Sequence, residues 1–339
     1  MKDKDINYDF NNIFPKDISD DFLFPFDTYF LFLEGLSINP LTFYQKWSDV
    51  KLQFISDKYW KSNQKSDWKW SLTFPFFSLL EHYINTINNP IIIGFSGLPG
   101  SGKSTLGSWI NSVARELSLD INVISLDDFY LPGQEMDFAM KGNPWNVPRG
   151  FPGSHSLDLL HQSLETFLKT GVISSPTFDK SLRYGKGDRS GWCKLQSKVL
   201  ILEGWFVGCE PASDLSKTDE LAEYELNLTL SQSEQDYRNL IQESLFEYTK
   251  IWKQFHKIWH LKSTNFDNTI LWKSQQENEM IKLKGSGLKG NNLSDFIRMI
   301  QTAIPQQSLS FINSDTTVEI NQNRRIEKLN TTKYYFQDN

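Results

Sequence analysis

The chain has 339 residues and a formal net charge of −6 at pH 7, so it is long enough for one large or two modest domains. This acidic balance argues against a general binder of nucleic acid or of anionic membranes. The two cysteines, Cys193 and Cys209, provide neither a disulfide framework nor a metal-binding spacing, which fits a reducing compartment.

The N-terminal segment MKDKDINYDFNN lacks the basic and apolar regions of a secretory signal and is too acidic for an organellar transit peptide. Apolar runs elsewhere are far shorter than the ~20 residues that span a bilayer. We therefore expect a soluble, cytoplasmic protein without a membrane span.

The first 89 residues are rich in large aromatic side chains with helix-like periodicity. They include Trp47, Trp60, Trp68, Trp70 and the run FPFF at 74–77. Because large aromatics mostly supply packing area, we expect 1–89 to be a helical N-terminal extension packed on a second domain at 90–339. The alternative is a peripheral membrane or partner surface built on the lysines among these tryptophans, Lys58, Lys61, Lys65 and Lys69.

A phosphate-binding loop follows the first predicted strand, 91–95. Residues 97–104, GLPGSGKS, match G-x-x-x-x-G-K-[ST] at every defined position. The glycines let backbone N–H groups point at phosphate oxygens, and the helix predicted at 103–118 adds its positive N-terminal end. We expect the nucleotide to bind Gly97, Gly100, Ser101, Gly102, Lys103, Ser104 and Thr105, with Lys103 on the β and γ phosphates and Ser104 on Mg²⁺.

Strands and helices alternate along the rest of the chain, which indicates parallel βαβ units. Further strands are expected at 121–126, 198–202, 257–262 and 308–312, and further helices at 157–170, 233–254, 265–284 and 293–303. Gly171 is expected to end the helix 157–170, and Asn292 or Ser294 to begin the last helix. The polar, acidic stretch 208–224 is expected to be a surface loop. The predicted fold is α/β, a P-loop NTPase-type parallel sheet flanked by helices.

Acidic residues stand where two predicted strands end. Asp127 and Asp128 follow the strand 121–126, and Glu203 follows the strand 198–202. Ligands of open α/β sheets bind outside the carboxyl ends of the strands. Phosphoryl transfer needs one carboxylate to accept the proton of the acceptor hydroxyl and another near Mg²⁺, so we assign Asp127 to the first role and Glu203 to the second. The alternative is that these carboxylates only cap a turn and end a strand.

Cationic segments punctuated by glycine lie between these strands. They are Arg149-Gly150, Gly153-Ser154-His155 and residues 179–189, DKSLRYGKGDR. Flexible loops of this kind could bind a small anion close to the γ-phosphate. A charge run in a loop is also often simply solvated.

The segments SGLPGSGKST, SLDDFYLP, RGFPGSHSLDLL, PTFDKSLRYGKGDR and LILEGWFVG together resemble the D-glycerate 3-kinases of the plant, fungal and cyanobacterial type. That family is similar to phosphoribulokinase, uridine kinase and pantothenate kinase, and the resemblance covers about residues 90 to 330. It implies transfer of the ATP γ-phosphate to the 3-hydroxyl of D-glycerate with Mg²⁺, in glycerate salvage of the photorespiratory type. It also implies Lys103 and Ser104 at ATP and Mg²⁺, Asp127 as the base, and Glu203 beside the metal. The substrate-loop residues that it implies are Arg149, His155, Asp179, Lys180 and Arg189.

The sequence departs from the family pattern at two places. Relatives often carry Asp directly after the histidine of the G-[ST]-H segment, whereas here Ser156 stands there and Asp158 follows two residues later. In the helix 265–284 the family tends to carry two lid arginines around a tryptophan, and here Lys273 follows Trp272. A lysine keeps the charge but loses the bidentate fork, so Lys273 is our lid candidate, with Lys282 as a substitute.

Other functions are also compatible with a phosphate loop. A nucleoside, pantothenate or sugar phosphate kinase is the nearest alternative, although loops dominated by Arg, Lys and His suit a small carboxylate better than a flat base. A GTPase-like regulatory switch would need base and phosphate motifs after apolar strands. Asp188-Arg189-Ser190-Gly191 and Ser216-Lys217-Thr218-Asp219 resemble such motifs but do not follow apolar strands. An ATP-binding partner without turnover is disfavoured by Asp127 and Glu203.

Overall fold

The computed structural model of the protein describes Phe14, Ile18 and residues 20–60, 66–212, 229–285 and 287–332. The fragment 216–219, the lysines Lys61 and Lys65, and most of the expected loop 208–224 lie outside the described residues. None of the helices within these ranges is long and apolar enough to cross a bilayer.

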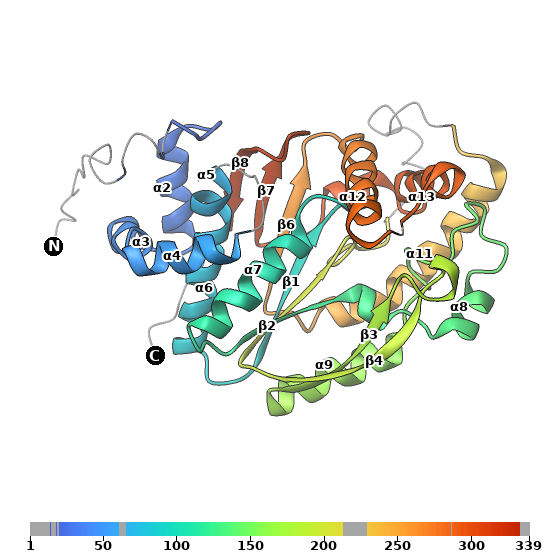
Figure 1. Cartoon of the computed structure of the whole chain (residues 1–339), viewed down its shortest axis with the longest axis horizontal. Coiled ribbons are helices and arrows are strands. Elements are labelled where there is room, and N and C mark those ends of the chain that lie inside the picture. The colour runs from blue at the N-terminus through green and yellow to red at the C-terminus, as the bar shows by residue number, and fades with distance from the viewer. Residues whose placement is uncertain are drawn as a thin grey trace.

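A six-stranded sheet forms the centre of the molecule (Figure 1). Its strands, in spatial order, are β2 (Ile121–Ser125), β5 (Val199–Gly204), β1 (Ile91–Gly97), β6 (Lys257–Ser263), β7 (Thr316–Ile320) and β8 (Ile326–Thr331). All neighbouring strands are parallel except β7 and β8. Every residue of β1 and β5 is buried, as expected for central parallel strands covered on both faces. The predicted α/β fold with a mostly parallel sheet flanked by helices is confirmed.

Successive side chains of β1 point to two separate hydrophobic cores. Ile91, Ile93 and Phe95 belong to the core beneath α7 (Lys103–Glu116) and the N-terminal helices, whereas Ile92 belongs to the core on the opposite face. The second core is covered by α9 (Leu157–Thr170), α11 (Gln232–Trp252), α13 (Gly290–Thr302) and α14 (Gln306–Ser310). The helix α12 (Asn268–Lys284) contributes Trp272 to the first core.

The described part of the N-terminal extension is helical, as its periodicity predicts. It forms α2 (Phe26–Gly35), α3 (Pro40–Trp47), α4 (Val50–Tyr59), α5 (Ser66–Trp68), the π-helical turn η2 (Lys69–Thr73) and α6 (Phe74–Thr86). Trp47 stacks on Phe74 with ring centroids 4.1 Å apart, and Phe76 packs against Trp259 of β6 at 4.4 Å. The extension therefore shares one core with the sheet, while the boundary between 1–89 and 90–339 stays a prediction.

The lysines proposed for a membrane or partner surface are engaged in ion pairs wherever they are described. Lys58 lies 3.0 Å from Glu116 of α7, and Lys69 pairs with Asp57. In both pairs the lysine binds another residue of this chain, which favours the packing role of the extension.

An antiparallel arm projects from the sheet and was not predicted. It consists of β3 (Val172–Asp179) and β4 (Asp188–Gln196), joined through the short turn η4 (Arg183–Gly185), and it lies beside α9 (Figure 1). The fragment 188–191 forms the start of β4, inside this arm. The sequence-based placement of α9 and of its end at Gly171, where φ is 70°, is confirmed.

Two predictions at the C-terminal end are wrong. Residues 306–310 form α14, so 308–312 is not a strand. Pro305 precedes this helix and presets a helix start, and only Leu309 of the apolar run 308–312 is deeply buried within it. The helix α13 begins at Gly290 and not after Asn292 or Ser294, with Lys289 in the extended conformation before it.

Candidate functional site

The phosphate loop is a tight turn between β1 and α7. Gly100 and Gly102 have φ angles of 75° and 112°, in the region that favours glycine. A Cβ atom at Gly100 would lie 2.8 Å from the backbone of Trp272, so close packing against α12 also requires glycine there. Because α7 begins at Lys103, its first N–H groups and its dipole favour an anion at this loop.

Lys103 lies inside the loop with 6% of its surface exposed, and its Nζ donates to the carbonyl oxygen of Leu98 at 3.1 Å. Burial lowers the pKa of Lys103, and the charges of Glu203 and Asp127 act in the opposite direction. A partly desolvated ammonium close to two carboxylates is well placed to receive phosphate oxygens.

Ser104 and Glu203 meet at the carboxyl edge of the sheet. The Oγ of Ser104 donates to Oε1 of Glu203 at 2.8 Å, and Glu203 stands in β5, next to β1. Hydroxyl and carboxylate oxygens are the ligands that Mg²⁺ prefers, and Mg²⁺ usually takes only one or two protein ligands together with waters and phosphates. Within the described ranges, no group of three or more His, Cys, Asp or Glu side chains could hold a metal by itself. The pair therefore fits a nucleotide-bound Mg²⁺ and not a metal site made by protein alone.

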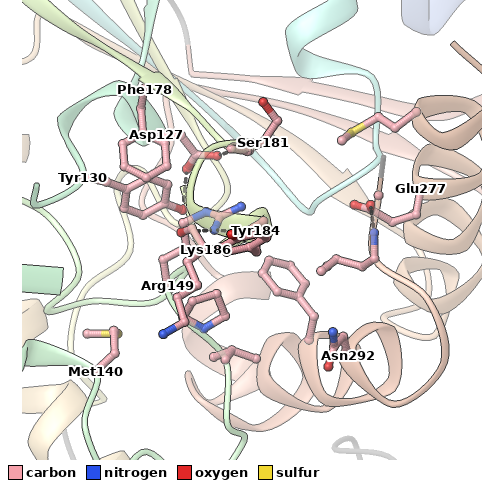
Figure 2. Close-up of a pocket in the computed structure, with 18 of the residues that line it drawn as sticks. Asp127, Tyr130, Met140, Arg149, Phe178, Ser181, Tyr184, Lys186, Glu277 and Asn292 are labelled. Atoms are coloured by element: carbon pink, nitrogen blue, oxygen red, sulfur yellow. Dashed lines mark hydrogen bonds and ion pairs between the residues drawn. The ribbon is translucent and has the colours of Figure 1, made fainter. Parts of the chain in front are cut away.

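A cleft of about 1280 Å³ opens beside this loop (Figure 2). The loop after α8 (Gly133–Ala139), the tip of the β3–β4 arm, and the helices α12 and α13 form its walls. Asp127, Arg149 and Lys180 line the cleft, as do the aromatic rings of Tyr130 and Phe178. The structure thus brings five of the predicted site residues to one cavity, these three together with Asp179 and Lys273.

Asp127 has a hydrogen-bond partner on each carboxylate oxygen. The Oη of Tyr130 donates to Oδ1 at 2.9 Å, and the Nζ of Lys180 donates to Oδ2 at 2.6 Å. Burial would raise the pKa of Asp127, but the charge and hydrogen bond of Lys180 outweigh burial and hold the pKa well below its usual range. Asp127 is therefore ionised at neutral pH.

Asp128, by contrast, is turned toward the arm. Its Oδ1 accepts from the backbone N–H of Phe178 at 3.3 Å. Burial raises the pKa of Asp128. It holds the end of β3 close to the tip of the arm and is absent from the lining of the cleft.

Arg149 lines the cleft and is only 8% exposed. Its Nη1 donates to the carbonyl oxygens of Gly185, at 2.9 Å, and of Lys186. Its guanidinium also lies 5.6 Å from the ring centroid of Phe178. Arg149 thus holds the tip of the arm with one nitrogen, and its Nε and Nη2 make no hydrogen bond within the described residues.

Two other predicted substrate residues, His155 and Arg189, have different surroundings. His155 stacks on Tyr130 at 4.4 Å and its Nδ1 lies 2.7 Å from the Oη of Tyr248. Burial lowers the pKa of His155 to about 4, so it is a neutral ring that supports Tyr130. Neither His155 nor Arg189, whose Nε donates to the carbonyl oxygen of Tyr130 at 3.2 Å, lines the cleft.

Asp179 does line the cleft, but its Oδ1 accepts from the N–H and the Oγ of Ser181, at 2.8 and 2.6 Å. It stabilises the first turn of the arm's tip. This local role explains why an aspartate opens the loop.

The lid candidate Lys273 is paired within its own helix. Its Nζ lies 2.5 Å from Oε1 of Glu277 and 4.7 Å from the ring centroid of Phe296 in α13. Burial lowers the pKa of Lys273, and Glu277 raises it. Lys273 lines the cleft, whereas the proposed substitute Lys282 is exposed and does not.

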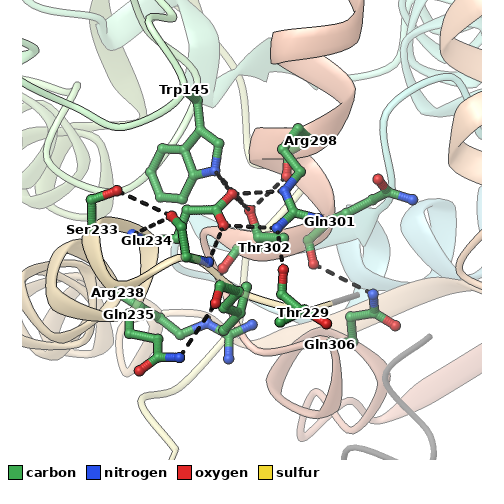
Figure 3. Close-up of polar contacts among 12 residues, drawn as sticks. Trp145, Thr229, Ser233, Glu234, Gln235, Arg238, Arg298, Gln301, Thr302 and Gln306 are labelled. Carbon is green, nitrogen blue, oxygen red and sulfur yellow. Dashed lines mark hydrogen bonds and ion pairs between the residues drawn. The ribbon is translucent and has the colours of Figure 1, made fainter. Parts of the chain in front are cut away.

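A buried polar network lies behind the cleft (Figure 3). The Nε of Arg298 in α13 donates to Oε1 of Glu234 in α11 at 2.7 Å. The Nε1 of Trp145 donates to Oγ1 of Thr302 at 2.7 Å and to the same Glu234 oxygen at 3.1 Å. This network joins the loop that carries Arg149 to the two helices beneath it.

Comparison with known proteins shows the family to which the chain belongs. No protein-family model matches it. An uncharacterised kinase of Schizosaccharomyces pombe is 31% identical over 228 residues, which cover 64% of this chain and 79% of that protein. The chain belongs to the P-loop kinases.

Two further relatives relate this P-loop kinase to the D-glycerate 3-kinases. The chloroplastic D-glycerate 3-kinase of Arabidopsis thaliana is 28% identical over 223 residues, covering 61% of this chain and 45% of that protein. The structure of D-glycerate 3-kinase from Cryptococcus neoformans has a TM-score of 0.64 and 25% identity, covering 76% of this chain and 97% of that one.

The structure adds residues of the P-loop kinase site that the sequence analysis missed. Tyr130 bonds Asp127, Glu277 pairs with Lys273, and Arg324 reaches the phosphate loop. Only Tyr130 had a sequence signal, since it follows Asp127 by three residues and the 3₁₀ turn η3 (Leu126–Phe129) brings it back to that carboxylate.

Proposed function

We propose that this P-loop kinase transfers the γ-phosphate of ATP to the 3-hydroxyl of D-glycerate and gives 3-phospho-D-glycerate. The observation that carries the proposal is the position of Asp127, which lies in the cleft between two cations, Lys180 and Arg149, and within electrostatic reach of Lys103 in the phosphate loop. A proton acceptor, an anion site and a phosphate site are thus adjacent.

Asp127 is the proton acceptor in this proposal. Its carboxylate takes the proton of the acceptor hydroxyl while the hydroxyl oxygen attacks the γ-phosphorus, and the bond from that phosphorus to the ADP oxygen breaks. Tyr130 orients the carboxylate through its hydrogen bond. Lys103 and Lys180 neutralise charge on the transferred group, which is usually the largest part of catalysis.

Ser104 and Glu203 would hold Mg²⁺ beside the phosphates. The ion would supply charge neutralisation at the β and γ oxygens. The 2.8 Å contact between the two side chains supports this assignment, because both oxygens face one point at the edge of the sheet.

The acceptor side of the cleft suits a small carboxylate. Arg149 keeps Nε and Nη2 for a ligand, and a guanidinium binds a carboxylate with two parallel hydrogen bonds. Only C2 and C3 of glycerate separate its carboxylate from its 3-hydroxyl oxygen, so a carboxylate held at Arg149 keeps that hydroxyl in the same cleft as Asp127.

A nucleoside or another flat acceptor is the second candidate, because Tyr130, Phe178 and Phe296 line the cleft. One face of each ring already has a neighbour. The guanidinium of Arg149 lies over the ring of Phe178, and the ammonium of Lys273 lies over the ring of Phe296. Tyr130 stacks on His155. These contacts favour rings that position charged groups over rings that stack on a base.

The test is an ADP-release assay of the purified chain with D-glycerate, L-glycerate, uridine, pantothenate and ribulose 5-phosphate. We expect D-glycerate to give the highest kcat/KM and the product to carry phosphate on the 3-oxygen. Preference for any other acceptor would overturn the assignment of substrate but not that of kinase. The cytoplasmic location and a role in glycerate salvage stay predictions.

A further inference from the structure

We propose that the N-terminal extension forms part of the nucleotide site. Asp67 and Trp68 hold the turn between β7 and β8, and that turn, through Arg324, holds the phosphate loop in its binding conformation. The inference rests on the proposed nucleotide function of the loop. It makes Asp67 and Arg324 positioning residues.

Arg324 connects three parts of the fold. Its Nε donates to the carbonyl oxygen of Gly100 at 2.8 Å, and its Nη1 donates to Oε1 of Gln275 in α12 at 3.0 Å. The guanidinium also lies 5.4 Å from the ring centroid of Trp272, whose Nε1 donates to the carbonyl oxygen of Gln322 at 2.7 Å. The turn, the helix α12 and the phosphate loop are therefore joined at one side chain.

The contact with Gly100 fixes the middle of the loop. Because a peptide unit is planar, holding the carbonyl of Gly100 also fixes the direction of the N–H of Ser101. That N–H donates to the carbonyl oxygen of Leu98 at 3.1 Å, the same oxygen that accepts from Lys103. Arg324 thus acts on the peptide units that place the lysine.

The extension holds Arg324 in an uncommon conformation. Its φ is 56°, which arginine seldom adopts without support from its surroundings. The Nε1 of Trp68 donates to the carbonyl oxygen of Arg324. The side chain of Asp67, which is 0% exposed, accepts from Nε of Arg325 at 2.8 Å and from the N–H of Ile326 at 3.2 Å.

A buried carboxylate needs these partners, since an unpaired charge in a core is strongly unfavourable. The contacts of Asp67 therefore fix the position of the turn between β7 and β8 relative to α5. A change at Asp67 reaches Gly100 through the turn, although Asp67 itself does not contact the phosphate loop in any described interaction.

The test compares Asp67→Asn with Phe43→Leu by calorimetric titration of the full chain with ADP and with inorganic tripolyphosphate, both with Mg²⁺. Phe43 lies in the aromatic core of the N-terminal extension, against Tyr29 and Trp70. Its replacement is the control for a general loss of stability of the extension. We expect Asp67→Asn to weaken both ligands roughly 2- to 30-fold, the range for residues that act from outside a ligand's contacts, and Phe43→Leu to leave both unchanged. Equal binding by the unchanged protein and Asp67→Asn would overturn this inference alone. Failure of the unchanged protein to bind ADP would overturn the proposed function as well.

Arg324→Asn provides a second variant that should fold, because asparagine tolerates a positive φ. It should weaken both ligands at least as much as Asp67→Asn. If Asp67 acts through Arg324, adding Asp67→Asn to Arg324→Asn should weaken binding no further, although it lowers the melting temperature. Additive effects on affinity would overturn the proposed connection.

Discussion

The Nζ of Lys180 lies 2.6 Å from Oδ2 of Asp127, while Tyr130 occupies the other carboxylate oxygen. Each oxygen of the carboxylate still has a second lone pair, so an acceptor hydroxyl can donate to Asp127 beside these two partners. Tyr130 is buried beneath its stack with His155, whereas the side chain of Lys180 is half exposed on the tip of the arm. Of the two contacts, that of Lys180 is therefore the one that can readjust when an acceptor binds.

Lys180→Met should move the acid limb of kcat/KM to higher pH. In the unchanged protein Lys180 keeps the pKa of Asp127 far below its usual range, so the base stays ionised as the pH falls. Without Lys180, burial dominates and the pKa rises, by about 1 to 3 units for a lost charge at this distance. A pH profile of residual activity measures the shift. Lys186→Met, which loses only a weak pair with Asp137 at 3.7 Å, is the control, and an equal shift in both variants would contradict the prediction.

Asp127→Asn should lower kcat by roughly 10² to 10⁴ with little change in nucleotide affinity, because asparagine keeps the size of the side chain but cannot accept the proton. Asp128→Asn should have a much smaller effect, since Asp128 bonds the backbone of Phe178 and does not itself line the cleft. Steady-state kinetics of both variants provide the measurement. The assignment fails if the two effects are reversed.

Lys103→Ala should reduce turnover by several orders of magnitude, in line with electrostatic stabilisation as the main catalytic contribution. Its melting temperature should not fall, because burial already disfavours the charged form of Lys103. Activity and thermal unfolding are measured on the same preparation. More than about a tenth of the original turnover would show that this loop is not the catalytic phosphate site.

The sequence predicts the parts of the site that are contiguous. The phosphate loop, Asp127 and Glu203 each follow a clear apolar run of a strand, and parallel strands bring their carboxyl ends to one edge. The edge strand β8 and its neighbour β7 have no such run, since IEKLNT and TTVEI mix polar and apolar residues. The apolar run at 308–312 was more strand-like than either of them.

Contacts between distant segments could not be predicted from one sequence. Lys180 and Asp127 are 53 residues apart, and Arg324 and Gly100 are 224 apart. The sequence alone does not distinguish Arg149 from Arg189 as a substrate residue. The fold places Arg149 in the cleft and Arg189 behind Tyr130. The arm that carries Arg189 was itself missed, because β4 alternates in burial and has few apolar residues.

Arg149→Lys should lower kcat/KM for the acceptor roughly 10- to 150-fold, because an ammonium cannot reproduce planar, two-pronged binding of a carboxylate. Arg189→Lys should have a smaller effect, since Arg189 bonds a backbone oxygen outside the cleft. Nucleotide affinity should stay nearly unchanged in both. Kinetics with varied acceptor and varied ATP separate these effects, and a uniform loss of ATP binding in Arg149→Lys would place that residue at the phosphates instead.

Glu234→Gln should destabilise the network behind the cleft and make stability less dependent on pH. Burial raises the pKa of Glu234, but Arg298 outweighs it and lowers the pKa to about 2. Because the pKa is lower in the folded state than the ordinary value of about 4.3, the ion pair contributes fully above that pH and is lost as the pH falls toward 2. Removing one partner of such a pair costs about 3 kcal/mol at pH 7.

Urea unfolding at pH 7 and pH 3 measures this difference, which should be smaller at pH 3. Glu247→Gln is the matched control on the same helix, since Glu247 pairs with Lys250 at 2.6 Å and both side chains are more than half exposed. An exposed pair contributes about 0.2 to 1 kcal/mol, so this control should change stability little at either pH. Equal losses in the two variants would show that Glu234 acts as a surface residue, and the loop carrying Arg149 would then need another explanation for its fixed position.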